Sequence, residues 1–219
     1  MHKVVDLELG VDILAANKRI AEENAKLLKK NKIKSFDFVG SIGSGKTLII
    51  ETIIDELKKR PDCGPKVGCI AGDVAGDDDY RRFKKHNVMA QNLNTKKECH
   101  LDAHLVAHAL DHMELGKIDV LFIENVGNLV CPTDFPLGAQ KRVLVISVTE
   151  GDDMVRKHPL IFRLSDIIVI NKVDLAKIME VDPEGLVKDA KKVRPDAKIF
   201  LTDARHGTGI KELMKAMGL

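Results

Sequence analysis

Residues Gly40-Ser41-Ile42-Gly43-Ser44-Gly45-Lys46-Thr47 decide the fold. They fit the pattern G-x-x-x-x-G-K-[ST], and they stand between a short apolar run and a helical stretch, as that pattern requires. Glycines allow backbone amides to surround phosphate groups, and the N-terminus of the following helix adds positive potential. The lysine supplies a point charge for the β- and γ-phosphates, and the threonine hydroxyl can bind Mg²⁺. We therefore predict a phosphate-binding loop whose contacts come from Gly43, Ser44, Gly45, Lys46 and Thr47.

Short apolar runs alternate with helical stretches along the chain, at residues 36–39, 67–71, 120–123, 143–146, 167–170 and 197–201. Such runs are typical of strands buried on both faces, and their alternation with helices predicts βαβ units in a parallel sheet. An amphipathic helix is expected at residues 12–32, ahead of the first run. The sequence thus predicts a three-layer α/β fold of the P-loop NTPase type. Its mostly parallel central sheet would lie in a domain of residues 35–219, after a helical extension of residues 1–34.

The composition excludes several classes of partner. Lysine and arginine number 35 against 33 aspartates and glutamates, so the 219-residue chain has a formal net charge of +2, and we expect no nucleic-acid partner. No apolar stretch approaches the roughly 18–20 residues of a membrane-spanning helix, so we expect no membrane partner. The four cysteines, Cys63, Cys69, Cys99 and Cys131, are too scattered for a disulfide framework. These features predict a cytoplasmic protein, with Cys69 in the core and Cys63 in an exposed loop.

The run at 167–170 is followed by Asn171-Lys172-Val173-Asp174, which resembles the N-K-x-D signature of P-loop GTPases. The resemblance implies that the Asp174 carboxylate accepts from both N1–H and N2–H of guanine, that Lys172 covers the ring face, and that Asn171 braces the neighbouring loop. Residues 203–210 resemble the weaker S-A-x-x-G-x-G loop, in which the amide of Ala204 would meet the base. Here Asp203 replaces the usual serine. GTP is therefore expected over ATP.

Two carboxylates follow the apolar runs next to the phosphate loop. Glu124 begins Glu-Asn-Val-Gly where most small GTPases carry D-x-x-G, and Asn128 stands in place of the glutamine that orients water in them. Asp73 follows the run at 67–71. We predict that Lys46, Asp73 and Glu124 are catalytic, and that Thr47, Asp73 and Glu124 hold Mg²⁺, with slow hydrolysis. Residues 77–79, three aspartates, are interpreted instead as the start of a helix.

A second group of potentially reactive side chains lies at Cys99-His100, with a further thiol at Cys131. Thiolate and imidazole ligands suit Zn²⁺ or Ni²⁺ better than Mg²⁺. We place Cys99 and His100 at the start of a helix, where positive potential favours a thiolate. Histidines then recur every four residues at 104, 108 and 112; His104 is a further candidate ligand, and an exposed polar helix face accounts for the other two.

Taken together, Gly-x-x-Gly-Ser-Gly-Lys-Thr, "LNTKKECHLDAHLV", "LFIENVGNLVCP", "VTEGDD" and "VINKVDL" resemble the HypB family of GTPases, within the dimerising branch of P-loop NTPases. The resemblance spans residues 12–219. It implies nickel insertion during [NiFe]-hydrogenase maturation, with Zn²⁺ or Ni²⁺ on Cys99, His100 and Cys131. It also implies a homodimer promoted by GTP and metal, with Cys131 at its interface, and contacts with a hydrogenase maturation partner and the hydrogenase large subunit.

Two other readings of the residues stay open. A P-loop kinase for a small metabolite would carry an arginine-rich lid, and the chain offers only Arg81-Arg82. A zinc-stabilised nucleotide-binding scaffold would retain its metal instead of transferring it. Phosphate release from GTP against ATP separates the first alternative from the GTPase, and the fate of the bound metal separates the second.

Overall fold

The computed structural model describes residues 2–61, 64–96 and 98–219, with side chains from residue 12 onward, so Cys63 lies outside the described residues. The helices are α1 (His2–Lys30), α2 (Lys46–Lys58), α3 (Asp78–Lys85), α4 (Ala103–Asp111), α5 (Met154–Lys157), α6 (Pro159–Leu164), α7 (Pro183–Val193) and α8 (Ile210–Met217). The strands are β1 (Lys34–Gly40), β2 (Val67–Asp73), β3 (Met89–Asn94), β4 (Val120–Glu124), β5 (Lys141–Ser147), β6 (Ile167–Asn171) and β7 (Lys198–Leu201). Single 3₁₀ turns occur at Leu115–Lys117, Cys131–Thr133, Val148–Glu150 and Val173–Leu175.

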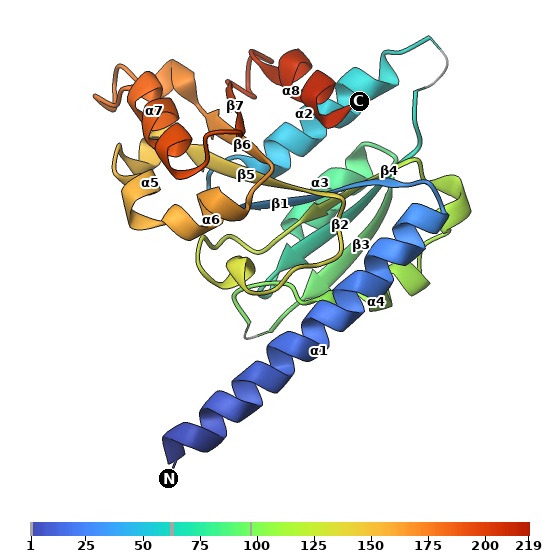
Figure 1. Cartoon of the computed structure of the whole chain (residues 1–219). Coiled ribbons are helices and arrows are strands. Elements are labelled where there is room, and N and C mark those ends of the chain that lie inside the picture. Colours follow the sequence, from blue (N-terminus) through green and yellow to red (C-terminus); the bar gives the residue numbers. More distant parts are fainter. Residues whose placement is uncertain (1, 62–63, 97) are drawn as a thin grey trace.

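The described strands form one seven-stranded sheet in the order β3-β2-β4-β1-β5-β6-β7. Every pairing is parallel, so the carboxyl ends of all strands lie at one edge (Figure 1). Because β1 lies between β4 and β5, the loop after it opens at the centre of that edge. The predicted α/β fold with a mostly parallel sheet is confirmed.

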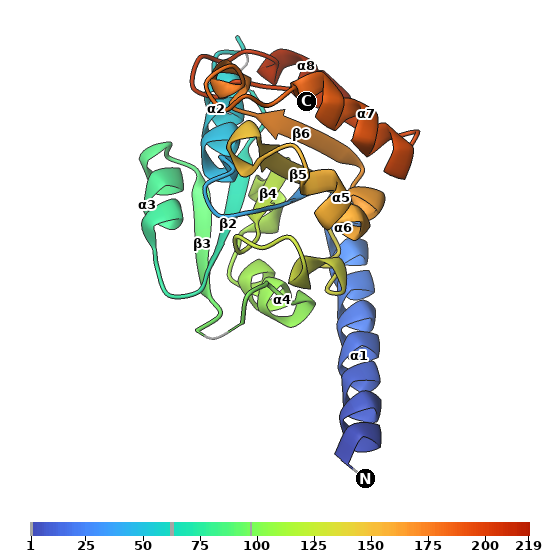
Figure 2. The same cartoon turned by 90° about the vertical axis from the view of Figure 1, so that its left-hand side faces the viewer.

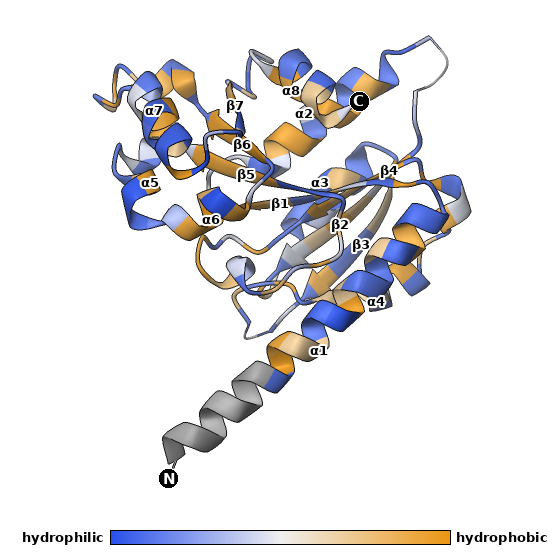
Figure 3. Ribbon diagram, in the orientation of Figure 1, coloured by the Kyte–Doolittle hydropathy of each residue, from blue (hydrophilic) through white to orange (hydrophobic). Residues whose placement is uncertain are grey.

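Alternation of side chains along the strands builds a core on each face of the sheet. Phe36 and Phe38 of β1 pack on one face with α2, α3 and α8. Val39 lies on the other face, where α5, α6 and α7 cover β5 and β6, while α1 and α4 cover β2 and β4. Figure 2 shows these helical layers on either side of the sheet, and Figure 3 shows the apolar side of α2 turned to it. The predicted three layers are therefore present.

Strand β3 was not predicted. It forms the edge of the sheet beside β2, and of its six residues Met89–Asn94 only Ala90 and Leu93 are buried. An edge strand covered on few sides needs few apolar residues. The segment therefore has too little hydrophobic signal to separate it from a loop.

The N-terminal helix begins earlier than predicted, at His2 instead of residue 12. Its first half extends away from the body of the protein (Figures 1 and 2). Its second half is attached through two buried asparagines: Asn17 accepts from the Ala103 amide at 2.7 Å, and Asn24 donates to the Ala103 carbonyl at 2.8 Å. The division of the chain at residue 34 stays a prediction. Among the described helices, none is both long enough and apolar enough to cross a membrane.

Candidate functional site

The phosphate loop connects β1 to α2. Gly45 lies just before the helix with φ of +102°, and a Cβ there would approach Nδ2 of Asn171 to 2.3 Å, so both conformation and space require glycine. The ammonium of Lys46 donates to the carbonyls of Gly40 at 3.2 Å and Ser41 at 3.0 Å. Burial lowers the pKa of Lys46, and the Glu124 carboxylate opposes that effect. A buried cation bent over its own loop is suited to a phosphate ligand.

The hydroxyl of Thr47 lies between two carboxylates. Its Oγ1 is 2.9 Å from Oε1 of Glu124 and 2.9 Å from Oδ1 of Asp79. Burial, with the nearby Asp79 charge, raises the pKa of Glu124 to about 8. The second oxygen of Glu124, Oε2, is buried and has no hydrogen-bond partner among the described residues. An unpartnered carboxylate oxygen beside a hydroxyl and a second carboxylate fits a hard cation such as Mg²⁺.

Asp79 was not predicted as a site residue, because the three aspartates at 77–79 were interpreted as a helix start in preference to a Mg²⁺ cluster. It does lie in the first turn of α3, but the same turn carries its carboxylate to Thr47. The predicted ligand Asp73 ends β2, half-buried, and its Oδ1 accepts from the Val74 amide at 2.6 Å. Asp73, Asp79 and Glu124 all line one cavity of about 510 Å³ together with the phosphate loop. Of these three carboxylates, Asp79 and Glu124 are the two that hydrogen-bond to Thr47.

The predicted base-binding residues lie around Asn171, at the end of β6. Its Nδ2 donates to the Ser44 carbonyl at 3.0 Å, and its Oδ1 accepts from the Ala204 amide at 3.2 Å. Lys172, in a left-handed conformation, donates to the Gly43 carbonyl at 2.7 Å. The buried Asn171 side chain thus hydrogen-bonds both the phosphate loop and the loop of Ala204, the second predicted base-binding segment.

Asp174 is exposed beside these loops. Ligand atoms of Asp174, Asp203 and His206 lie within 4.8 Å of one another. Asp203 accepts from the His206 ring and from the amides of Arg205 and His206, at 3.0 Å and 3.2 Å for the amides. The position usually held by serine therefore carries a carboxylate whose acceptors are occupied within its own loop.

Cys99, His100 and Cys131 form a second group, with ligand atoms all within 4.8 Å of one another. The two sulfurs are 2.7 Å apart, and Asn128 donates to Cys131 Sγ at 3.4 Å. The hydrogen bond with Cys99, together with burial, raises the pKa of the Cys131 thiol. Residues that are distant in sequence thus place two thiols and an imidazole together, which is a donor set for Ni²⁺ or Zn²⁺.

The imidazole of His100 has the features of a metal ligand. It is 8% exposed, its ring centroid is 3.9 Å from that of Phe135, and burial lowers its pKa, which favours the neutral form. Its Nδ1 is buried without a partner among the described residues. A buried nitrogen left unpaired costs free energy that a metal ion would recover.

Two expectations about this segment change. Helix α4 begins at Ala103 with Asp102 as its N-cap, so Cys99 and His100 lie in the preceding loop and not at a helix start. His104 is exposed on α4 and is not a member of the three-residue group. Cys69 is fully buried in the core, as predicted.

Comparison with known proteins places this site in a family. The CobW/HypB/UreG nucleotide-binding domain matches residues 36–201. The probable hydrogenase maturation factor HypB of Methanocaldococcus jannaschii is 52% identical over 215 residues, covering 98% of this chain and 96% of that protein. The crystal structure of HypB from Archaeoglobus fulgidus is 46% identical with a TM-score of 0.84, covering 92% of this chain and 96% of that one.

A further solved structure, HypB from Helicobacter pylori in complex with nickel, is 33% identical with a TM-score of 0.85. It covers 91% of this chain and 92% of that chain. The family is one of nucleotide-binding P-loop proteins, which supports nucleotide hydrolysis in general as the chemistry of the phosphate-loop cavity. Fold, phosphate loop and sequence identity agree: the chain belongs to the CobW/HypB/UreG family, among the HypB hydrogenase maturation factors.

Proposed function

We propose that the protein hydrolyses GTP and uses the nucleotide cycle to control the binding and delivery of nickel during [NiFe]-hydrogenase maturation. The observation that carries this proposal is the position of the two groups on one segment. Glu124, which contacts the phosphate-loop Thr47, ends β4, and Cys131 of the metal group follows seven residues later. A change at the nucleotide therefore acts on a short segment that carries a nickel ligand.

Hydrolysis rests on charge placement around the γ-phosphate. Lys46 supplies a buried positive charge, and Thr47, Glu124 and Asp79 would hold Mg²⁺. When bound there, Mg²⁺ would neutralise charge on the β- and γ-phosphates. Asp73 lines the same cavity and is the proposed partner of the attacking water. Without a glutamine after Gly127, unaided turnover should be near the intrinsic Ras-like rate of about 10⁻⁴–10⁻³ s⁻¹.

Guanine specificity rests on the pairing of donors and acceptors. The exposed carboxylate of Asp174 offers two acceptors to the paired N–H donors of guanine, which adenine lacks, and the Ala204 amide offers a donor. Asn171 fixes these loops relative to the phosphate loop. This arrangement supports GTP over ATP.

Nickel is the cargo of the proposed cycle. Cys99, His100 and Cys131 supply three soft or borderline ligands, one fewer than a closed tetrahedral zinc site takes, which suits a site that must release its metal. HypB of Helicobacter pylori has been solved with nickel. A second copy of the chain would complete the site in a homodimer, and the recipients would be a maturation partner and the hydrogenase large subunit.

The test is phosphate release with GTP or ATP in Mg²⁺, combined with nickel transfer to a chelator or acceptor. Lys46→Ala should abolish release, whereas Lys59→Ala, a change of an exposed lysine just beyond α2, should not. Equal turnover of ATP would favour the small-molecule kinase, and metal that stays bound through the cycle would favour the zinc-stabilised scaffold.

A further inference from the structure

Asn125 lies between the nucleotide cavity and the metal group. It follows Glu124 at the end of β4 and is 1% exposed. Its backbone amide donates to the Phe38 carbonyl of β1 at 2.9 Å. Its Oδ1 accepts from the amides of Leu101 and Val126, each at 3.0 Å. One side chain therefore holds both the residue after His100 and the second residue after Glu124.

The hydrogen bonds of this side chain use both ends of an amide. Nδ2 of Asn125 donates to Oδ1 of Asp37 at 3.2 Å, while Oδ1 faces two N–H donors. A carboxylate at this position would face the Asp37 carboxylate, and a hydroxyl would not reach all three partners. The asparagine amide thus satisfies a donor–acceptor pattern that neither a carboxylate nor a hydroxyl at this position would match.

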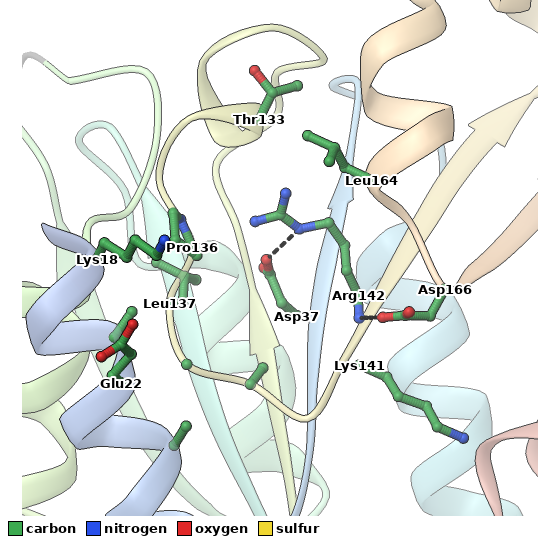
Figure 4. A pocket seen from close by; sticks show the side chains of 14 residues that line it. Lys18, Glu22, Asp37, Thr133, Pro136, Leu137, Lys141, Arg142, Leu164 and Asp166 are labelled. Carbon is green, nitrogen blue, oxygen red and sulfur yellow. Dashed lines mark hydrogen bonds and ion pairs between the residues drawn. The ribbon is translucent and has the colours of Figure 1, made fainter. Parts of the chain in front are cut away.

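An ion pair between Asp37 and Arg142 holds the Nδ2 end of the Asn125 amide. Asp37 of β1 and Arg142 of β5 are register partners, and Arg142 Nε donates to Asp37 Oδ2 at 3.0 Å. The Asp37 and Arg142 side chains are 3% and 12% exposed. Figure 4 shows the pair at the wall of a cavity of about 470 Å³, with the Arg142 backbone held by Asp166. Because two neighbouring strands hold this pair, it gives Asn125 a rigid reference.

The two backbone groups held by Asn125 belong to segments in contact with the two sites. Gly127 lies against the phosphate loop, since a Cβ there would approach the amide of Ile42 to 2.9 Å. Leu101 is fully buried, and a Cβ on Gly72 would meet its side chain at 2.7 Å and the Glu124 carbonyl at 2.8 Å. A shift of residues 126–127 on binding of a γ-phosphate would therefore act, through Asn125, on the loop that carries Cys99 and His100.

We propose that Asn125 is the positioning residue that transmits the nucleotide state to the nickel ligands. Its Oδ1 accepts from one backbone amide of each segment, while its Nδ2 donates to Asp37, which is paired with Arg142. This inference rests on the proposed function. Coupling between two ligands is reciprocal and typically changes affinity by about 5–150-fold. We expect the change in nickel affinity between the two nucleotide states to depend on Asn125, because this residue joins the two segments and is a proposed ligand of neither Mg²⁺ nor nickel.

The experiment measures the nickel dissociation constant with GDP and with a non-hydrolysable GTP analogue, and takes their ratio. Asn125→Asp should bring the ratio from about 5–150-fold to near one, because the new carboxylate repels Asp37. The double variant Asn125→Asp with Asp37→Asn should restore the ratio. Its asparagine at 37 donates to the new carboxylate and still offers its oxygen to Arg142, so every hydrogen bond and the net charge are kept.

The ratio of the two nickel dissociation constants distinguishes a loss of coupling between nucleotide and nickel from a simple loss of stability. A residue that only supported the fold would weaken both affinities together and leave the ratio unchanged. Ser165→Ala is the matched control, because it removes a buried hydrogen bond of 2.7 Å to the Ile161 carbonyl without contacting Asn125, and it should keep the parent ratio. If Asn125→Asp does not fold, Asp37→Asn serves instead, since Asn125 and Arg142 donate to different oxygens of Asp37, and the Nδ2 of an asparagine there would face one of these two donors with a donor of its own.

The outcomes are distinguishable. A parent ratio well away from one that falls in Asn125→Asp and returns in the double variant supports the inference. The same parent ratio unchanged in Asn125→Asp, or in Asp37→Asn, overturns it and leaves the proposed function intact. A parent ratio of one, with nickel and GTP both bound, overturns the coupled cycle of the proposed function and this inference with it.

Discussion

Thr47 and Glu124 are 77 residues apart in the chain, and the Thr47 hydroxyl donates to Oε1 of Glu124 at 2.9 Å. The contact joins the first turn of the helix after the phosphate loop to the end of β4. The next residue, Asn125, accepts from the amide of Leu101, and the same segment continues to Cys131, so in the proposed cycle this contact would be the first step between the phosphates and the thiols. The order of strands at the centre of the sheet therefore places the two sites side by side.

Asp79 and Asp73 should have separable effects on hydrolysis. Asp79 contacts Thr47 and Asp73 does not, so Asp79→Asn should raise the Mg²⁺ concentration needed for half-maximal rate by about tenfold or more, as expected when a charged partner worth about 1.5–3 kcal/mol is lost. Asp73→Asn should keep the Mg²⁺ requirement and lower kcat. Titration of Mg²⁺ in a phosphate-release assay measures both. A change in Mg²⁺ requirement in Asp73→Asn alone would assign the cation to the carboxylate of β2.

Asp174→Asn should convert the base preference. In the proposed guanine site the substitution replaces an acceptor by a donor opposite a donor of the base, and such mismatches cost up to about 10⁴-fold in discrimination. The variant should lose GTP affinity and bind xanthosine triphosphate, as displacement of a fluorescent nucleotide would measure. Asp196→Asn, at a side chain 80% exposed, is the control and should bind GTP like the parent. Full GTP affinity in Asp174→Asn would place the guanine site elsewhere.

Glu124 should make the stability of the empty protein depend on pH. Its pKa is raised from 4.5 to about 8, mainly by burial, so the folded state binds more protons than the unfolded state between these values. Stability is therefore fully present below about pH 4.5, falls as pH rises toward 8, and levels off above it, a loss of up to about 5 kcal/mol.

Urea unfolding of nucleotide-free protein in a chelator, between pH 5 and 9, measures this dependence. Glu124→Gln removes the titration, so its stability relative to the parent should rise with pH across that window. Glu114→Gln, at an exposed helix-end position, should follow the parent curve. Parallel curves for the parent and Glu124→Gln would show that Glu124 titrates alike in the folded and unfolded states.

The sequence predicts best where one local signal is strong. Val143–Ile146 and Ile167–Ile170 are continuous apolar runs, and they form the buried strands β5 and β6. The phosphate-loop pattern predicts the strand before it and the helix after it, because this arrangement of glycines and lysine is rarely found in another structural context. Strand β3 lacks such a signal, since an edge position permits polar residues such as Gln91 and Asn92.

Convergence of distant residues is what the sequence alone does not give. Cys99 and Cys131 are 32 residues apart, and their sulfurs meet because β3 leads to one loop and β4 to the other at the same edge of the sheet. Asp79 has the composition of a helix start, and its contact with Thr47 depends on how α3 packs beside β2. The sequence predicts which residues lie at the same edge of the sheet. The distances between their side chains depend on how the helices and loops pack.

Cys131 should link metal binding to dimerisation. It is half-buried beside Cys99, in a segment that begins at Glu124, and it lies outside the phosphate and base loops. In a symmetric dimer the same patch of each copy faces its equivalent, so two Cys131 thiolates can meet across the axis and complete the coordination of nickel or zinc. Cys131→Ala should then lose metal-promoted dimerisation while it still binds GTP.

Sedimentation of the parent and Cys131→Ala, with Ni²⁺ or Zn²⁺ and with GDP or a GTP analogue, measures this directly. The parent should reach dimer mass most readily with both metal and GTP analogue, because each ligand must favour the other to the same extent. Cys69→Ala, which removes a thiol that is buried in the core and is not a member of the metal group, controls for thiol loss and should dimerise like the parent. If Cys131→Ala dimerises as well as the parent, and nickel binds equally in both nucleotide states, the thiol has no part in the nucleotide cycle, because a ligand that discriminates between two states must shift the balance between them.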